Sequence, residues 1–208
     1  MKTYPKIPYN NEKLYGLETW AFYKYDGSNI RFEWNRKRGW YKFGTRTQLI
    51  SPTEPIYGRS IDIFIEKYGD DLSNIFTSKY KNIESVIVFG EYFGENSFAG
   101  KHMETDKMDV IIFDVSLYKK GFISPNEFLD NFGHLDISKL VYNGKYNEDF
   151  VYSVKQNKLD LLEGVVCKGT LKSKKDGDLL WMSKIKTDHW LSKVKQLYGD
   201  KRLIEEFS

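Results

Sequence analysis

The sequence predicts an α+β fold, built of antiparallel sheets with flanking helices. Short apolar and alternating segments, separated by turn residues, dominate the chain and indicate a high sheet content. Helical and strand segments follow one another without regular alternation, which argues against a doubly wound parallel sheet. The chain has no internal repeat, low-complexity tract or linker, so we expect one domain over residues 1–208.

The first predicted elements surround a turn at Asp26-Gly27. Residues 20–32 predict a strand, this turn and a second strand, because apolar runs flank a dipeptide that favours turns. Apolar side chains recur at helical spacing over residues 61–76, so they predict either one helix or a pair of short helices.

Two strands and a short helix are predicted in the middle of the chain. Residues 85–93 and residues 110–115 have the apolar pattern of buried strands. Residues 124–127 (SPNE) then have the form of a capping box, with proline at the first helical position. Gly133 can end this helix.

The last third of the sequence predicts a strand pair and a closing helix. Residues 165–168 and 179–186 are apolar runs with a turn signal at Asp176-Gly177 between them. From Asp188 onward, apolar residues at helical spacing predict an amphipathic helix.

Composition is that of a soluble globular protein. The net charge of +3 and the pI of about 8.6 permit a phosphate-rich partner without requiring one, and we expect weak, salt-sensitive binding to nucleic acid. The single cysteine, Cys167, cannot form an internal disulfide, which fits a reducing cytosol. No run approaches the roughly 18 apolar residues of a membrane helix. The start of the chain lacks the pattern of a secretory signal, so a cytoplasmic location without membrane contact is expected.

Lys24 is the candidate nucleophile. It lies at the end of a predicted apolar strand and is followed at once by a glycine turn, which would hold it at the edge of a cleft. A lysine acts as a nucleophile only when it is neutral, so such a role requires burial or nearby cations. The alternative is a surface lysine before a hairpin turn.

Two acids and two further lysines also lie on predicted apolar strands. Glu91 is embedded in one strand, Glu163 opens another, and Lys184 and Lys186 lie two residues apart on one strand face. Buried charges must be paired, bind a metal or face a ligand. Together they predict a site for a triphosphate and a divalent metal, whereas each alone fits a salt bridge or a solvated strand face.

The order of these motifs resembles the covalent nucleotidyltransferase superfamily of ligases and capping enzymes. The order is Lys-x-Asp-Gly, an aromatic-flanked Glu, Glu-Gly-Val-Val-x-Lys and Lys-x-Lys, and the likeness covers essentially the whole chain. The resemblance implies a nucleotidyltransferase (ATP-grasp-like) domain of antiparallel sheets with flanking helices.

Three details are similar to phage-type RNA ligases that seal nicks in duplex RNA. Asn29 stands five positions after the lysine, where DNA ligases and capping enzymes usually carry arginine. Arg46 lies in a Gly-Thr-Arg-Thr segment that looks like the essential arginine segment of those RNA ligases. Residues 94–102 are also similar to a stretch of those ligases, and no role is assigned to them.

The resemblance implies a role for each candidate residue. Lys24 would attack the α-phosphate of ATP and hold AMP as a phosphoramidate. Lys184 and Lys186 would contact that phosphate, and their charges would favour the neutral form of Lys24. Glu163 would help to bind the metal, for which Mg²⁺ is the natural choice. Glu91 would hydrogen-bond the ribose. Phe113 would stack on the adenine, unless it is an ordinary core residue. Asn29 and Arg46 would bind either the nucleotide or the nucleic acid ends.

Five other residues are not assigned a catalytic role. His102, His134 and His189 share no metal-like spacing, so zinc is not expected. A packed thiol explains Cys167 better than a nucleophile does. Asp26 is explained by the turn as well as by any catalytic duty.

The function implied is that of an ATP-dependent RNA ligase that works in RNA repair, joining 5′-phosphate and 3′-hydroxyl ends through lysyl-AMP and an adenylylated 5′ end. Its partners would be RNA as a nicked duplex or broken ends, DNA as a second option, and an accessory nucleic-acid-binding or end-healing protein. The alternatives are a compact DNA ligase and a binding module without turnover. Because residues 187–208 suffice for one helix only, we expect no OB-fold or helical domain after Lys186, and we do not expect NAD in place of ATP.

Overall fold

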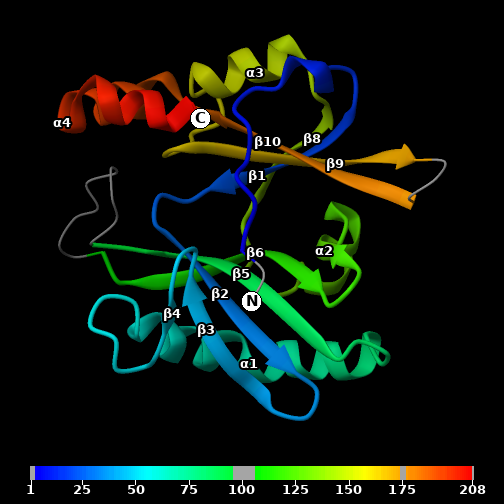
Figure 1. Cartoon of the computed structure of the whole chain (residues 1–208). Helices are drawn as coiled ribbons and strands as arrows, with labels where there is room; N and C mark the ends of the chain where they lie inside the picture. Colours follow the sequence, from blue (N-terminus) through cyan, green and yellow to red (C-terminus); the bar gives the residue numbers. More distant parts are fainter. Residues whose placement is uncertain (1–2, 96–105, 174–176, 208) are drawn as a thin grey trace. The chain divides into compact units, whose positions relative to one another are not determined.

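The computed structural model describes residues 3–95, 106–173 and 177–207. The predicted α+β class is confirmed, since two antiparallel sheets are accompanied by α-helices (Figure 1). No helix in these residues is long and apolar enough to cross a membrane.

The described chain forms two compact units, and the sheets divide between them. Among the described residues, unit 1 comprises 3–5, 27–95 and 106–137, and unit 2 comprises 6–26, 138–173 and 177–207. The expectation of one domain over residues 1–208 remains a prediction.

Unit 1 contains a six-stranded antiparallel sheet with the strand order β4-β3-β2-β5-β6-β7. Its strands are β2 (Ser28–Asn35), β3 (Gly39–Thr45), β4 (Leu49–Ile50), β5 (Ser85–Phe93), β6 (Asp109–Leu117) and β7 (Gly121–Phe122). Its helices are α1 (Arg59–Lys79) and α2 (Pro125–Phe132).

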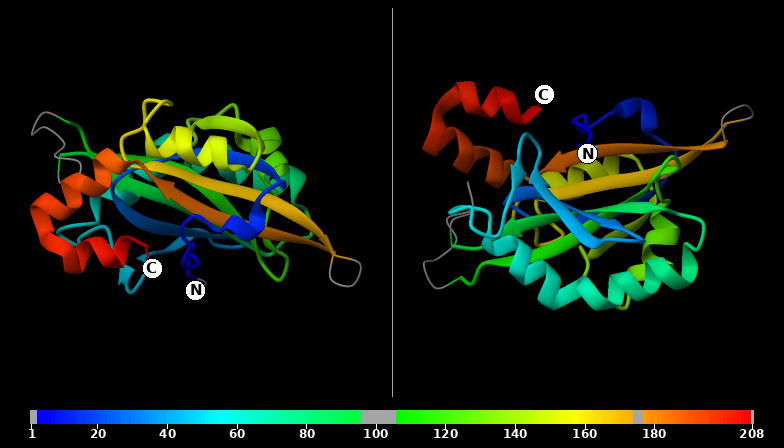
Figure 2. Two further views of the ribbon diagram at one scale, coloured as in Figure 1. Left: turned by 90° about the horizontal axis from the view of Figure 1, so that it is seen from above. Right: turned by 60° about the horizontal axis from the view of Figure 1, so that its bottom comes forward.

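One face of the six-stranded sheet packs against α1, which runs across it (Figures 1 and 2). Phe32 of β2 stacks on Phe64 of α1 with ring centroids 3.7 Å apart, and Trp34 contacts Phe76 at 5.4 Å. Side chains alternate between the two faces of a strand. The intervening residues of β2 therefore point to the opposite face, which we call the second face of unit 1.

The start of α2 follows the sequence prediction. The hydroxyl of Ser124, the N-cap residue, accepts a hydrogen bond from the backbone N–H of Glu127 at 3.2 Å. Pro125 is the first residue of the helix. Gly133 follows the helix at its C-cap. Residues 61–76 form one helix, not two, because they lie inside the single helix α1.

Unit 2 contains a four-stranded antiparallel sheet with the strand order β10-β9-β1-β8. Its strands are β1 (Glu18–Lys24), β8 (Leu140–Lys145), β9 (Gly164–Ser173) and β10 (Gly177–Lys186). The helical segments are a short 3₁₀ turn, η1 (Glu12–Leu14), with α3 (Glu148–Lys155) and α4 (Asp188–Phe207).

The core of unit 2 lies between its sheet and α3. Ala21, Cys167 and Ile185 of three neighbouring strands are fully buried and cluster with Val154 of α3. α4 changes direction at Gly199, whose φ of 78° lies outside the helical region.

The two strands predicted around Asp26-Gly27 are both present, but they do not form a hairpin. β1 belongs to the sheet of unit 2, whereas β2 belongs to the sheet of unit 1. Gly27 starts the unit 1 segment, and a Cβ added there would lie 2.4 Å from the carbonyl oxygen of Tyr92. A glycine is therefore required where the chain leaves one sheet and enters the other.

Candidate active site

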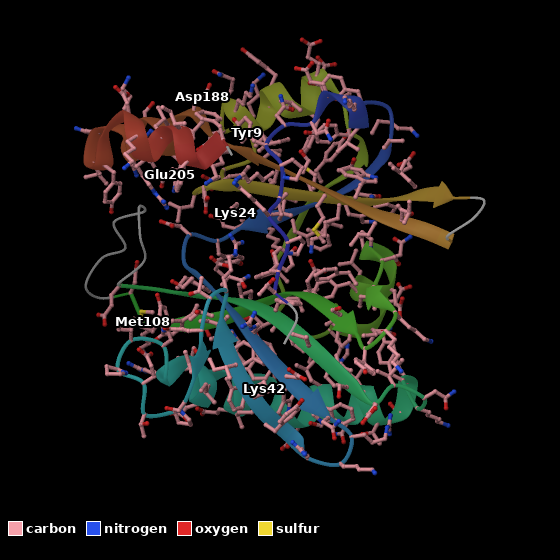
Figure 3. All side chains as sticks on the ribbon, in the orientation of Figure 1. Tyr9, Lys24, Lys42, Met108, Asp188 and Glu205 are labelled. Carbon is pink, nitrogen blue, oxygen red and sulfur yellow. The ribbon has the colours of Figure 1, made fainter. Side chains whose placement is uncertain are left out.

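Three strand ends of unit 2 meet at Gly164. In the register of the sheet, Lys24 at the end of β1 lies opposite Gly164, and Gly164 lies opposite Lys186 at the end of β10. Glu163 directly precedes this glycine, so its carboxylate is positioned between the two lysines. Figure 3 labels Lys24 at the end of its strand.

The carboxylate of Glu163 bridges the two ammonium groups. Its Oε2 lies 2.8 Å from Nζ of Lys24, and its Oε1 lies 2.6 Å from Nζ of Lys186. The side chains of Glu163 and Lys186 are each 3% exposed, whereas that of Lys24 is 24% exposed. Lys24 is thus the member of the cluster that a ligand can reach.

Glu163 is held in its charged form. Burial alone would raise its pKa, but the positive charges of Lys24 and Lys186 and their hydrogen bonds outweigh burial, and the pKa is lowered. An ionised carboxylate at this depth is sustained by its two partners.

Gly164 is a geometric requirement of this cluster. Its φ is +156°, and a Cβ added to it would lie 2.1 Å from the carbonyl oxygen of Ile185. The glycine of the Glu-Gly motif therefore allows β9 and β10 to approach each other where the charges meet.

Gly164→Ala is expected to lower the free energy of unfolding by at least about 2 kcal/mol, because backbone must move to admit the methyl group. Gly69→Ala is the matched control. Gly69 lies inside α1 and its added Cβ makes only ordinary contacts from 3.4 Å, so this change should stabilise the protein by about 0.5–1 kcal/mol. Urea denaturation measures both, and equal effects would contradict the packing argument.

Trp190, in the first turn of α4, covers the second lysine. Nζ of Lys186 lies 3.9 Å from the centroid of the Trp190 ring, which is 3% exposed. The hydroxyl of Thr187 accepts a hydrogen bond from the backbone N–H of Trp190 at 3.1 Å, and the N–H of Thr187 donates to the carbonyl of Glu163 at 2.9 Å. Lys186 is therefore held by a carboxylate and by an aromatic face.

If Lys24 attacks ATP as the sequence predicts, Trp190→Leu is expected to slow this attack by about tenfold with little change in ATP affinity, because Lys186 loses its cation–π partner. Trp190→Phe should restore most of the rate. Trp181→Leu is the control, since Trp181 is a second buried tryptophan, 7% exposed, and lies in the hydrophobic core on β10, the strand that carries Lys186. Its replacement should cost stability but leave the rate per folded molecule unchanged. An equal rate loss in both leucine variants would contradict the positioning role.

Lys184 lies on β10, an edge strand of the four-stranded sheet, where residues 8–10 pair with it. Its backbone N–H donates to the carbonyl of Pro8, and its carbonyl accepts from the N–H of Asn10, each at 2.9 Å. Between them, Tyr9 packs edge-on against Phe207 of α4 with ring centroids 4.8 Å apart. The half-buried side chain of Lys184 shares a strand face with that of Lys186.

Asn29 and Glu91 are neighbours in unit 1. They lie opposite each other where β2 pairs with β5. The Oδ1 atom of Asn29 is buried and has no hydrogen-bond partner among the residues that the structure describes. A buried acceptor without a partner is costly, so this atom is suited to a ligand that donates a hydrogen bond.

Phe113 occupies an irregular position in β6. The register passes from Phe89 opposite Asp114 to Gly90 opposite Ile112, so Phe113 is the extra residue of a bulge, a feature that redirects a side chain. It is half-buried, and Tyr4 meets its ring at 84° with centroids 5.1 Å apart.

Tyr4 is fixed by Asp114, next to Phe113. Its hydroxyl donates to Oδ2 of Asp114 at 2.6 Å. Burial, followed by the charge and hydrogen bond of Asp114, raises the pKa of Tyr4. Tyr4 was not predicted from the sequence, since nothing around residue 4 signals a partner 110 positions away.

Arg46 follows the last residue of β3 and is exposed. The hydroxyl of Thr45 accepts hydrogen bonds from the N–H groups of Thr47 and Gln48 at 3.3 and 3.2 Å, which shapes the turn that carries Arg46. Beneath it, a Cβ on Gly44 would lie 3.1 Å from Nε of the buried Arg31. The Gly-Thr-Arg-Thr segment is thus a tight turn with its arginine directed to solvent.

The lysine motif runs through both units, with residues 24–26 in unit 2 and residues 27–29 in unit 1. Unit 2 brings Lys24, Glu163 and Lys186 together, and unit 1 places Asn29 beside Glu91.

No group of three or more His, Cys, Asp or Glu side chains suited to a metal occurs in the described part of the chain. Both oxygens of Glu163 are bonded to lysines. Mg²⁺ is usually held by one or two carboxylates together with substrate phosphates. The donor set therefore fits a metal that arrives with a nucleotide, not one held in a cage of protein ligands.

Two of the residues that were given no catalytic role from the sequence are Cys167 and His102. Cys167 is fully buried, and burial raises the pKa of its thiol, so the prediction of a packed thiol is confirmed. His102 lies outside the described residues, as does most of the segment at residues 94–102.

Comparison with known proteins gives one family and a set of similar structures. The RNA ligase family matches residues 17–185. No curated protein matches the chain. The chain is similar to Naegleria gruberi RNA ligase with PPi, with a TM-score of 0.66, 16% identity, and coverage of 94% of this chain and 58% of that one. A variant of that ligase with ATP and Mn gives a TM-score of 0.62 and 14% identity, covering 93% and 58%. These likenesses show the fold, and the chain spans about 58% of the length of the structures it matches.

Proposed function

The chain belongs to the RNA ligase family, and from this premise we propose that it is an ATP-dependent RNA ligase that joins 5′-phosphate and 3′-hydroxyl ends through a lysyl-AMP intermediate. The observation that supports this chemistry best is the cluster of Lys24, Glu163 and Lys186. Within it, one lysine is accessible and the other is fixed in the interior.

The accessible lysine is the nucleophile of the proposed first step. After Lys24 leaves Glu163 and loses a proton to solvent, its Nζ forms a bond to the α-phosphorus of ATP. The bond from that phosphorus to the β-phosphate oxygen breaks, and pyrophosphate leaves. Lys186 stays beside the reacting phosphate and offsets the negative charge that develops there, with Lys184 on the same strand face.

Two further steps complete the proposed reaction. The 5′-phosphate of one RNA end attacks the AMP phosphorus and releases Lys24, which gives an adenylylated 5′ end. The 3′-hydroxyl of the other end then attacks the 5′-phosphate, the phosphodiester forms and AMP leaves. Each step exchanges one phosphorus–oxygen or phosphorus–nitrogen bond for another, so no redox partner is required.

The nucleotide is proposed to be ATP with a divalent metal, because a variant of the similar Naegleria gruberi RNA ligase has a structure with ATP and Mn. Mg²⁺ bound to its phosphates, with Glu163 as protein ligand, would supply positive charge to the triphosphate. Glu91 and the unpartnered Oδ1 of Asn29 would accept hydrogen bonds from ribose hydroxyls or the incoming end, and Phe113 would stack on adenine. The exposed Arg46 would contact the nucleic acid.

Intact mass of the purified protein after incubation with ATP and Mg²⁺ tests the first step. A mass increase equal to one AMP is expected, and hydroxylamine should remove it, as for a phosphoramidate. If ATP binds but no adduct forms, the ligase proposal fails and the protein is a nucleotide-binding module.

The substrate is tested with nicked duplexes that carry either a ribose or a deoxyribose at the 3′-hydroxyl side, because the 2′-hydroxyl is what a protein can read. Preferential sealing of the ribose nick, or of broken single-stranded RNA ends, would support a role in RNA repair. Equal sealing of DNA would identify a compact DNA ligase. Sealing that requires another protein would point to an accessory end-healing partner.

A further inference from the structure

A groove lies on the second face of unit 1, and neither Asn29 nor Glu91 lines it. It has a volume of about 550 Å³. Glu33 on β2 and Ile87 on β5 are register partners at its floor, and Ser116 on β6 pairs with Ile87. The residues that line this groove include Glu33, Ile87, Ser116, Tyr118, Lys119 and Lys120.

The groove lies on the same strand face as Asn29. Asn29 and Glu33 are four residues apart on β2, which places them about 13 Å apart along the strand. Their partners on β5, Glu91 and Ile87, are also four residues apart. A single strand whose end lies at Asn29 and Glu91 can therefore reach the groove within the same unit.

Glu33 offers one carboxylate oxygen to a ligand. Its Oε1 accepts a hydrogen bond from the hydroxyl of Tyr41 at 2.5 Å. Burial, followed by this hydrogen bond and the charge of Glu33, raises the pKa of Tyr41 to about 12, so the phenol stays a donor. The Oε2 atom is buried and has no hydrogen-bond partner within the described residues. Such an atom favours a ligand with an N–H or O–H group.

The rim of the groove is aromatic and basic. Tyr118 is 52% exposed, and Nζ of Lys119 lies 5.2 Å from the centroid of its ring. Lys119 lies in the turn between β6 and β7 with a φ of +62°. Both Lys119 and its neighbour Lys120 are exposed. An exposed ring with ammonium groups at its side combines a stacking surface for a base with partners for phosphates.

We propose that this groove binds one nucleotide of a single-stranded RNA segment that leads to the ligated end. The base stacks on Tyr118, a base N–H or ribose hydroxyl donates to Oε2 of Glu33, and Lys119 and Lys120 neutralise the adjoining phosphates. This rests on the proposed function for the nature of the ligand. A duplex is disfavoured, because its bases are stacked inside and its phosphates would face the carboxylate.

Fluorescence anisotropy of the full chain with a short labelled single-stranded RNA, at several salt concentrations, tests the proposal. Tyr118→Ala is expected to weaken binding about tenfold, and Tyr118→Phe should bind like the wild type because it keeps the ring. The double variant Lys119→Ala/Lys120→Ala should reduce the slope of log affinity against log salt by about 0.7 for each lysine.

A tyrosine elsewhere in the protein provides the matched control. Tyr152 is 55% exposed, and Nζ of Lys158 lies 4.9 Å from its ring centroid, so it reproduces the local chemistry of Tyr118 in unit 2. Tyr152→Ala should leave RNA affinity unchanged. If Tyr118→Ala binds RNA as the wild type does, or if it loses only duplex affinity, the proposal is wrong.

Lysyl-AMP formation separates this proposal from the proposed function. All groove variants should form the AMP adduct at the wild-type rate, because none of their residues belongs to the nucleotide site. Weakened RNA binding with an intact adduct supports the groove. Unchanged RNA binding with an intact adduct overturns the groove alone, whereas an absent adduct in the wild type overturns the ligase and leaves the binding measurement to decide the groove.

Discussion

Lys24→Arg is expected to abolish the AMP adduct while the protein remains folded and binds ATP. Arginine keeps the positive charge that Glu163 requires at 2.8 Å, so the ion pair is retained. A guanidinium does not lose its proton in a protein and cannot act as the nucleophile. Intact mass after incubation with ATP measures the adduct, and its loss should exceed a factor of a thousand or be complete.

Lys24→Ala should abolish the adduct as well. Comparison with Lys24→Arg separates the loss of the positive charge at residue 24 from the loss of the nucleophile. Because alanine leaves Glu163 with one cation, this variant should also be less stable than Lys24→Arg in urea. An adduct on Lys24→Arg that maps to another residue, such as Lys184, would show that the nucleophile has been misassigned.

Glu163→Gln is expected to have the largest effect on stability. The amide cannot neutralise Lys186, whose side chain is 3% exposed, or Lys24. Removal of one partner of a buried ion pair typically costs about 3–5 kcal/mol. For a chain of this length, that corresponds to a fall in Tm of roughly 10 °C. Thermal and urea denaturation measure the change, and the AMP adduct should be lost in the same variant.

A double variant provides the control for this interpretation. Glu163→Gln/Lys186→Met removes the carboxylate together with its most buried partner, so it should recover part of the stability that Glu163→Gln loses. If the double variant is as unstable as the sum of the single variants, the two side chains do not stabilise each other.

The same carboxylate gives stability a defined dependence on pH. Because the folded-state pKa of Glu163 is lowered, its contribution is complete above the unfolded pKa of about 4.3 and is lost as pH falls from there towards the folded pKa. Wild type should therefore lose more stability than Glu163→Gln between neutral pH and about pH 3. Parallel losses in urea denaturation would contradict this assignment.

Much of the fold and of the charged cluster could be predicted because the information is local. The strand predicted at residues 85–93 has the bounds of β5, since its apolar pattern is continuous. Lys24, Glu163 and Lys186 are each next to a recognisable motif, and strand pairing through Gly164 brings them together.

The missed features depend on distant contacts or on weak patterns. Trp190 resembles an ordinary apolar residue of a helix, and only the fold places Lys186 against its ring. β8 is half-buried and contains an Asn-Gly pair, which is typical of turns. α3 did have a local signal, since the side chain of Asn147 accepts a hydrogen bond from the N–H of Phe150 and caps the helix.

The sharing of one carboxylate by two lysines also has a consequence for the direction of the proposed reaction. Lys24, Glu163 and Lys186 carry two positive charges and one negative charge, so the cluster has a local excess of one positive charge before any nucleotide binds. An anion completes the neutralisation, whether it is the triphosphate or the pyrophosphate released from it. In the proposed reaction, pyrophosphate should therefore compete with ATP for this cluster and drive the first step backwards.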